Sequence, residues 1–153
     1  MDKPRHAVIT GGEGELARAI ADELSSREYR VDAPGRNVLD VTDRDGVAAY
    51  FAERPGITLL VNNAGITRDY PFLRMPEDDR DAVLDTNLTG ALRCSREAIR
   101  QMLRSRTPGH LVQIGSFAAL HGTSGQSAYA AAKAGLIGLT RSLAREVGPR
   151  DIR

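Results

Sequence analysis

The sequence predicts an α/β fold, a doubly wound parallel sheet with helices on both of its faces. Short apolar runs alternate along the chain with longer segments whose apolar residues recur at helical spacing. One run, residues 57–61, is almost continuously apolar, which is typical of a strand buried on both faces. Turns rich in glycine or asparagine follow two of the runs and mark places where strands end. Such alternation favours parallel strands joined by helical crossovers.

Each element follows from its own pattern. The predicted strands are residues 6–10, 29–33, 57–61 and 111–114. The predicted helices are about 15–27, 44–54, 77–106 and 127–147. The first helix has Leu16, Ala19, Ile20 and Leu24 on one stripe, and Pro34-Gly35 stops the second strand.

Composition sets broad limits on the function. The chain of 153 residues is 41% hydrophobic, which predicts one domain over residues 1–153 with a single core. A net charge of +1 gives no electrostatic reason to expect a nucleic acid or an anionic membrane as partner. The only cysteine, Cys94, cannot form an internal disulfide and fits a reducing cytoplasm. It is more simply interpreted as a small packed residue than as a reactive thiol.

Other segments point the same way. No run approaches the ~20 apolar residues of a membrane span. Residues 1–5 lead directly into the first strand, which does not suggest a signal peptide. The histidines at 6, 110 and 121 lack metal-ligand spacing, so we expect no metal site.

Tyr129 and Lys133 lie four residues apart on a predicted helix and therefore share one face. An ammonium beside a phenol favours its ionised form, which makes a tyrosine a usable acid or base. Ser116 lies thirteen residues upstream, just after a strand, where its hydroxyl could hold a substrate oxygen. Taken alone, the pair is equally consistent with an incidental surface Tyr/Lys pair.

A glycine-rich turn joins the first strand to the first helix. Gly12-x-Gly14-x-x-Ala17 fits the G-x-G-x-x-G/A dinucleotide fingerprint in the strand–turn–helix context that the fingerprint requires. The glycines let a pyrophosphate approach backbone N–H groups at the positive end of a helix. Glu13 and Glu15 are unexpected beside a phosphate, so their side chains must point to solvent or the site is weakened.

These motifs occur together in one order along the whole chain. They are Thr10-Gly11-Gly12-Glu13-Gly14, Asp40-Val41, Asn62-Asn63-Ala64-Gly65, Asn87, Ser116 and Tyr129-x-x-x-Lys133. In this order and spacing the chain resembles the short-chain dehydrogenase/reductase family, which implies a Rossmann-like fold. Residues 114–138 resemble in particular the 3-oxoacyl-acyl-carrier-protein reductases of that family.

The resemblance implies a role for each matching residue. Tyr129 would be the general acid/base, Ser116 would orient the substrate oxygen, and Lys133 would act on Tyr129 and bind the nicotinamide ribose. Asn87 would hold a water in a proton relay behind Lys133. Asp40 would accept a hydrogen bond from the adenine amino group, although helix capping or a turn is a serious alternative. The implied cofactor contacts are Gly11, Gly12, Gly14, Leu16, Arg36, Asp40, Val41, Asn63, Ala64, Gly65, Tyr129 and Lys133.

Three departures from the family pattern bear on these expectations. The family's middle glycine falls on Glu15 and its last on Ala17, which puts the geometry of the glycine loop in doubt. Gly14 would replace the middle glycine by a shift of one residue, and alanine is tolerable at the last position for helix–strand packing. Between residue 33 and Asp40 there is no room for a crossover of a dozen or more residues, so we expect the family's third strand to be missing, rudimentary or irregular. The family's last strands and substrate-covering segment lie beyond the point reached by residue 153, so we expect a domain incomplete at its C-terminus.

Two functions follow from these observations. The first is an NAD(P)-dependent oxidoreductase acting on a carbonyl or secondary alcohol, with a 3-oxoacyl thioester as the leading substrate. Arg36 would pair with a 2′-phosphate and favour NADP(H) over NAD(H), unless it is a solvated loop cation. The second is a catalytically silent nucleotide-binding or dimerisation module. We expect a homodimer or homotetramer through helices 77–106 and 127–147. Arg104 and Arg106 are either contacts for an acidic carrier protein or, more simply, cations that complement a helix end.

Overall fold

The computed structural model describes residues 5–153 and contains a four-stranded parallel sheet in the order β2-β1-β3-β4. The strands are β1 (His6–Ile9), β2 (Arg30–Asp32), β3 (Leu59–Asn62) and β4 (His110–Gln113). The helices are α1 (Glu15–Ser26), α2 (Arg44–Ala52), α3 (Glu77–Leu84), α4 (Gly90–Ser105), α5 (Ala118–His121) and α6 (Ser127–Val147). The predicted α/β class is confirmed. Residues 1–4, interpreted above as leading into the first strand, lie outside the described residues.

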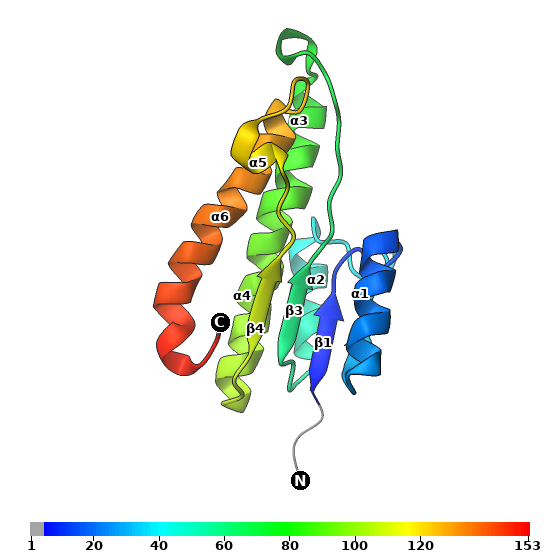
Figure 1. The fold of residues 1–153 in the computed structure, drawn as a ribbon. Coiled ribbons are helices and arrows are strands. Elements are labelled where there is room, and N and C mark those ends of the chain that lie inside the picture. The colour runs from blue at the N-terminus through cyan, green and yellow to red at the C-terminus, as the bar shows by residue number, and fades with distance from the viewer. Residues whose placement is uncertain (1–4) are drawn as a thin grey trace.

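Helices cover both faces of the sheet (Figure 1). Side chains of β1 and β3 alternate between the two faces, as the pleat requires. On one face, Ile9 and Val61 pack with Ala17 of α1. On the other, Val8 and Leu60 pack with side chains of α2, α4 and α6, which include Phe51, Cys94, Met102 and Val147. The core therefore has two layers of helix around one layer of strands, which confirms the doubly wound arrangement.

The register of the strands brings their carboxyl ends to one edge. Ile9 of β1 is paired with Val61 of β3, and Asn62 of β3 with Gln113 of β4. The loops after these strands carry the residues that the sequence analysis singled out. The parallel sheet thus places the glycine turn, the asparagine loop and Ser116 along the same edge of the fold.

The predicted helix over residues 77–106 is confirmed from Glu77 to Ser105, but it is not a regular α-helix throughout. A π-helical turn, η2 (Asp85–Thr89), separates α3 from α4. The Asn87 side-chain amide donates to the carbonyl oxygens of Val83 (2.9 Å) and Ile66 (2.8 Å), so the turn is fixed by a segment far from it in sequence. Such π-turns are frequent at functional sites.

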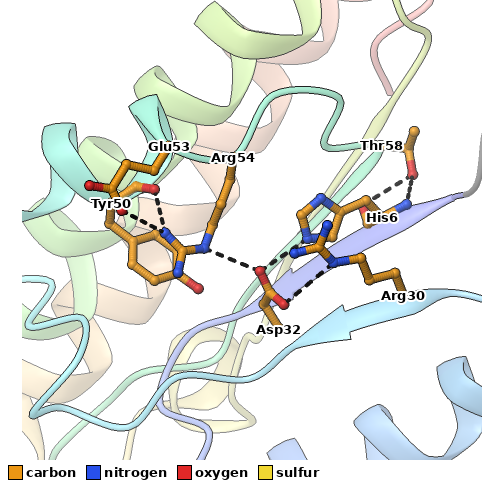
Figure 2. Close-up of polar contacts among 7 residues, drawn as sticks. All are labelled: His6, Arg30, Asp32, Tyr50, Glu53, Arg54 and Thr58. Atoms are coloured by element: carbon orange, nitrogen blue, oxygen red, sulfur yellow. Dashed lines mark hydrogen bonds and ion pairs between the residues drawn. The ribbon is translucent and has the colours of Figure 1, made fainter.

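No strand occurs between β2 and α2, in agreement with the expectation for that short segment. The edge strand β2 is instead tied to β1 and to the turn after α2 through Asp32, whose carboxylate lies 3.1 Å from both His6 Nε2 and Arg54 Nε (Figure 2). At the opposite edge, Ile152 forms a parallel bridge with Gly109 and is buried, so residues 151–153 run alongside β4. Within residues 5–153, no helix has the length and apolar character needed to cross a membrane.

Candidate functional site

The glycine turn after β1 is packed tightly against two other loops. Gly11 has a φ of +69°, and a Cβ at this position would lie 2.9 Å from the Cα of Ala64. A Cβ on Gly12 would lie 2.0 Å from the carbonyl oxygen of Ala33. These two positions therefore require glycine for backbone conformation and close approach, respectively. Gly14 differs, because it has a φ of −74° as the N-cap of α1.

Thr10 joins the ends of the two central strands. Its Oγ1 accepts hydrogen bonds from the backbone N–H of Asn63 (3.0 Å) and of Ala64 (2.9 Å). In return, the Asn63 side-chain amide donates to the carbonyl oxygens of Thr10 (3.0 Å) and Gly11 (3.3 Å). Asn63 thus braces the glycine turn through its side chain.

A cavity of about 120 Å³ lies beside this junction. Its lining contains six of the predicted cofactor contacts, which are Gly11, Arg36, Asp40, Val41, Ala64 and Gly65. Leu39, Ile66 and Thr86 complete the lining and were not foreseen. Gly65 leaves room for Asn87, because a Cβ on Gly65 would lie 2.6 Å from Asn87 Oδ1. The cavity is mainly backbone and apolar surface with one acidic and one basic side chain, a lining suited to a flat heteroaromatic ring.

Asp40 has partners within its own loop. Its Oδ1 accepts from the backbone N–H (2.9 Å) and the hydroxyl (2.7 Å) of Thr42, and its Oδ2 accepts from Arg36 Nε (3.0 Å). Partial burial acts to raise the pKa of Asp40, but these hydrogen bonds outweigh it and hold the pKa below its ordinary value. The turn role considered above is therefore present. Asp43, not Asp40, is the N-cap of α2.

Asn87 is almost fully buried at 1% exposure, at the centre of the π-turn. Both hydrogen bonds of its amide nitrogen go to carbonyl oxygens, while its Oδ1 has no hydrogen-bond partner within the described part of the chain. A buried acceptor without a partner is costly and invites a water or a ligand donor. Residue 87 therefore presents a buried acceptor, and its role in a proton relay stays a prediction.

Lys133 and Tyr129 lie on one face of α6, as their spacing predicts. Lys133 Nζ lies 5.7 Å from the centroid of the Tyr129 ring and donates to the carbonyl oxygen of Ile114 at 2.7 Å. Lys133 is 3% exposed, and burial lowers its pKa. Ser116, two residues beyond Ile114, is half-buried, and its Oγ accepts from the N–H of Ala118 at 3.2 Å. The lysine therefore ties α6 to the strand end that carries the serine.

A family model described as short chain dehydrogenase matches residues 36–153 of this chain. The chain belongs to the short-chain dehydrogenase family. The match includes the asparagine loop, Asn87, Ser116, Tyr129 and Lys133, so these residues lie in the part of the sequence that the family model describes.

Curated relatives are similar over nearly all of this chain. The 3-oxoacyl-[acyl-carrier-protein] reductase FabG of Aquifex aeolicus is 42% identical over 149 residues, covering 95% of this chain and 59% of the relative. The enzyme of the same name from Salmonella typhimurium is 39% identical over 168 residues, covering 95% of this chain and 68% of the relative. That from Staphylococcus aureus is 40% identical over 147 residues, with coverages of 95% and 59%. The chain thus spans roughly 59% to 68% of the length of these relatives.

The glycine turn and its neighbouring cavity fit the dinucleotide that this family uses. The supporting observation within the fold is a tight glycine turn, here called the glycine cradle, in which Gly11 packs against the backbone of Ala64 and Gly12 against that of Ala33. It lies next to a cavity lined by backbone and apolar side chains. Leu16 and Gly14 do not line this cavity, although Leu16 is 52% exposed at the start of α1. These two positions, like the other predicted cofactor contacts, remain predictions.

Sequence reasoning missed a buried polar network behind the site. Asn62 Nδ2 donates to Ser95 Oγ and to Gln113 Oε1, each at 3.0 Å. These residues come from β3, α4 and β4, and no motif signals that they meet. Cys94, beside them in sequence, is completely buried, and burial raises the pKa of its thiol to about 12. Within residues 5–153, no group of three or more potential metal ligands is found.

Proposed function

We propose that the protein is an NAD(P)-dependent oxidoreductase that interconverts a carbonyl and a secondary alcohol. The observation that carries the proposal is Lys133, which lies 5.7 Å from the centroid of the Tyr129 ring and donates to the carbonyl oxygen of Ile114, two residues before Ser116. A nicotinamide dinucleotide, when bound, supplies or accepts the hydride. We also propose that residues 1–153 form a single domain.

The side chains divide the remaining work. In the reducing direction, Tyr129 gives its phenolic proton to the substrate oxygen, and the nearby Lys133 ammonium stabilises the phenolate that results. Ser116 donates its hydroxyl hydrogen to the same substrate oxygen and stabilises the developing negative charge. The orphaned Oδ1 of Asn87 accepts from a water that returns a proton towards Lys133.

The finer features of the substrate and cofactor are part of the proposal. A 3-oxoacyl group linked to an acyl carrier is the leading substrate because the relatives carry that name. NADP(H) is favoured over NAD(H) because Arg36 can pair with a 2′-phosphate. Its side chain is 77% exposed and lines the cavity beside Gly11, and only its Nε is used by Asp40. A cytoplasmic location agrees with a single buried cysteine.

We also propose a homodimer or homotetramer through α3–α4 and α6, the helices of the predicted ranges 77–106 and 127–147. A groove of about 580 Å³ lies between α4 and α6 and combines apolar side chains, which include Leu92, Ile99, Leu139 and Leu143, with charged Arg93, Arg96 and Glu146. Mixed apolar and charged lining suits a self-complementary contact. Leu143→Arg should lower the molar mass measured by light scattering, whereas Leu120→Arg on α5 should not.

The activity is tested by comparing two tyrosine variants. The chain is mixed with NADPH or NADH and a 3-oxoacyl thioester, and nicotinamide absorbance is followed. Tyr129→Phe should abolish turnover while dinucleotide binding, measured by fluorescence, is retained. Tyr29→Phe, at the far end of the fold before β2, should leave both intact. Binding without turnover in the unaltered chain would instead favour the silent nucleotide-binding module, and binding of neither dinucleotide would overturn the proposal.

A further inference from the structure

Asp32 stands where dinucleotide-binding folds often read the ribose. In such folds an acidic residue about 20 residues beyond the glycine turn, at the end of the second strand, accepts a hydrogen bond from the ribose 2′-OH. Asp32 ends β2, but its Oδ2 lies 3.1 Å from both His6 Nε2 and Arg54 Nε (Figure 2). Its carboxylate is thus used to join β2 to β1 and to the turn that follows α2. The turn that follows, Ala33-Pro34-Gly35, carries no charged side chain.

Glu13 brings a carboxylate to this turn from the glycine loop. A Cβ built on Gly35 would lie 2.4 Å from Glu13 Oε1, so the glycine leaves the space that the carboxylate occupies. The loop is fixed there because the Gly12 N–H donates to the carbonyl oxygen of Pro34 at 2.9 Å. Within residues 5–153, the Glu13 carboxylate makes no ion pair or side-chain hydrogen bond.

Arg36 follows Gly35 directly and carries the opposite charge. Its Nε donates to Asp40 Oδ2 at 3.0 Å, and its side chain lines the cavity beside Gly11. The end of β2 is therefore flanked on one side by a carboxylate that has no partner among the described residues and on the other by a guanidinium already shared with a carboxylate.

We propose that Glu13 is a specificity-determining residue that favours NAD(H) and acts against Arg36. This inference rests on the proposed function, because it assumes that the dinucleotide lies in the glycine cradle. The Glu13 carboxylate takes over the place of the diverted Asp32: it accepts hydrogen bonds from the ribose hydroxyls of NADH and repels the 2′-phosphate of NADPH. The choice of cofactor then depends on the balance between the Glu13 carboxylate and the Arg36 guanidinium. Arg36 favours NADP(H), and Glu13 reduces this preference.

Equilibrium binding of the two dinucleotides tests this directly. The dissociation constants of NADPH and NADH are measured by fluorescence for the unaltered chain, Glu13→Gln, Glu15→Gln and Arg36→Gln. Glu13→Gln should raise the affinity for NADPH relative to NADH by about five-fold or more, and added salt should shrink this change. Arg36→Gln should move the ratio in the opposite direction. Glu15→Gln, a matched exposed glutamate two residues away, should leave the ratio unchanged.

The outcomes separate this inference from the proposed function. If both dinucleotides bind but Glu13→Gln leaves their affinity ratio unaltered, or if Glu15→Gln changes it equally, the role of Glu13 is overturned and the dehydrogenase proposal stands. If neither dinucleotide binds to the unaltered chain, both are overturned. Circular dichroism of each variant checks that the fold is retained.

Discussion

The ammonium of Lys133 donates a 2.7 Å hydrogen bond to the backbone carbonyl oxygen of Ile114. The bond spans 19 residues of sequence and fixes α6 against the carboxyl end of β4. It also holds a buried positive charge in the neighbourhood of Tyr129 and Ser116. A charge in this position costs folding free energy while it serves the proposed chemistry, a conflict that is common at functional sites.

This conflict has a defined pH dependence. Because burial lowers the pKa of Lys133 from 10.5, the unfolded chain binds this proton more tightly than the folded chain. The lysine therefore lowers stability at all pH values below its folded-state pKa, and this penalty disappears as the pH rises through that value to 10.5. We compare the free energy of unfolding of Lys133→Met with that of the unaltered chain. The value for the variant minus that for the unaltered chain should be larger at neutral pH than near pH 10.5. Urea unfolding at both pH values measures this; a difference that stays constant or grows with pH contradicts it.

Thr10 provides a second prediction, on stability. Thr10→Val keeps the shape of the side chain but leaves the N–H groups of Asn63 and Ala64 without their acceptor. We expect a loss of about 2–4 kcal/mol in the free energy of unfolding, since an unpaired buried donor costs about 1–3 kcal/mol. Thr10→Ser retains the oxygen and should lose less than about 1 kcal/mol. Equal losses in the two variants would mean that the methyl group, not the hydroxyl, matters.

The fold was largely predictable because its signals are local. The apolar runs gave all four strands to within about two residues, and the helix predicted at 127–147 begins and ends where α6 does. The short link after β2 correctly excluded an ordinary crossover. Features that depend on distant contacts were missed, above all the π-turn around Asn87, which is held by Ile66. The four-residue α5 was also missed, since it is too short to show a helical period.

The candidate site was predictable only where a motif names its members. The spacing of the motifs predicts where Tyr129, Lys133 and Gly11 lie. It does not predict the hydrogen-bond partners of the other charged residues near the site. Nothing in the sequence shows that Asp40 is used by Thr42 and Arg36, or that Asp32 turns towards His6 and away from the sheet edge. Each carboxylate has several oppositely charged residues nearby in the sequence, and tertiary packing decides which of them it contacts.

The cluster around Asp32 gives a third prediction. Arg54 stacks over the Tyr50 ring at 3.6 Å and donates to Asp32 at 3.1 Å, with its side chain only 23% exposed. Arg30 lies 4.0 Å from the same carboxylate with its side chain 68% exposed. Arg54→Met should lower the free energy of unfolding by about 1–3 kcal/mol, because it removes the partner of a half-buried charge. Arg30→Met should change it by less than about 0.5 kcal/mol. Chemical unfolding of both variants tests the contrast, and similar losses would contradict it.

Alanine variants of Gly12 and Gly14 give a fourth prediction. They distinguish a glycine that the packing of the fold requires from one that only ligand binding would require. A Cβ on Gly12 would meet the backbone of Ala33 at 2.0 Å, and neither strand end can move without losing the bond from Gly12 N–H to Pro34. Gly12→Ala should therefore lower the free energy of unfolding by about 2 kcal/mol or more. A Cβ on Gly14 has its nearest neighbour at 3.6 Å, so Gly14→Ala should change stability by less than about 1 kcal/mol.

Dinucleotide binding tests whether Gly14 is needed for the ligand, which the stability of the fold does not show. If phosphates approach the backbone at the start of α1, a methyl group on residue 14 obstructs them, and Gly14→Ala should weaken NADH and NADPH by similar factors with the fold intact. The free energy of unfolding from urea titration and the two dissociation constants from fluorescence are measured on the same preparations. A Gly14→Ala protein that binds both dinucleotides as tightly as the unaltered chain would show that the phosphates do not contact this residue. The shift of one position from the family's middle glycine to Gly14 would then have no role in binding.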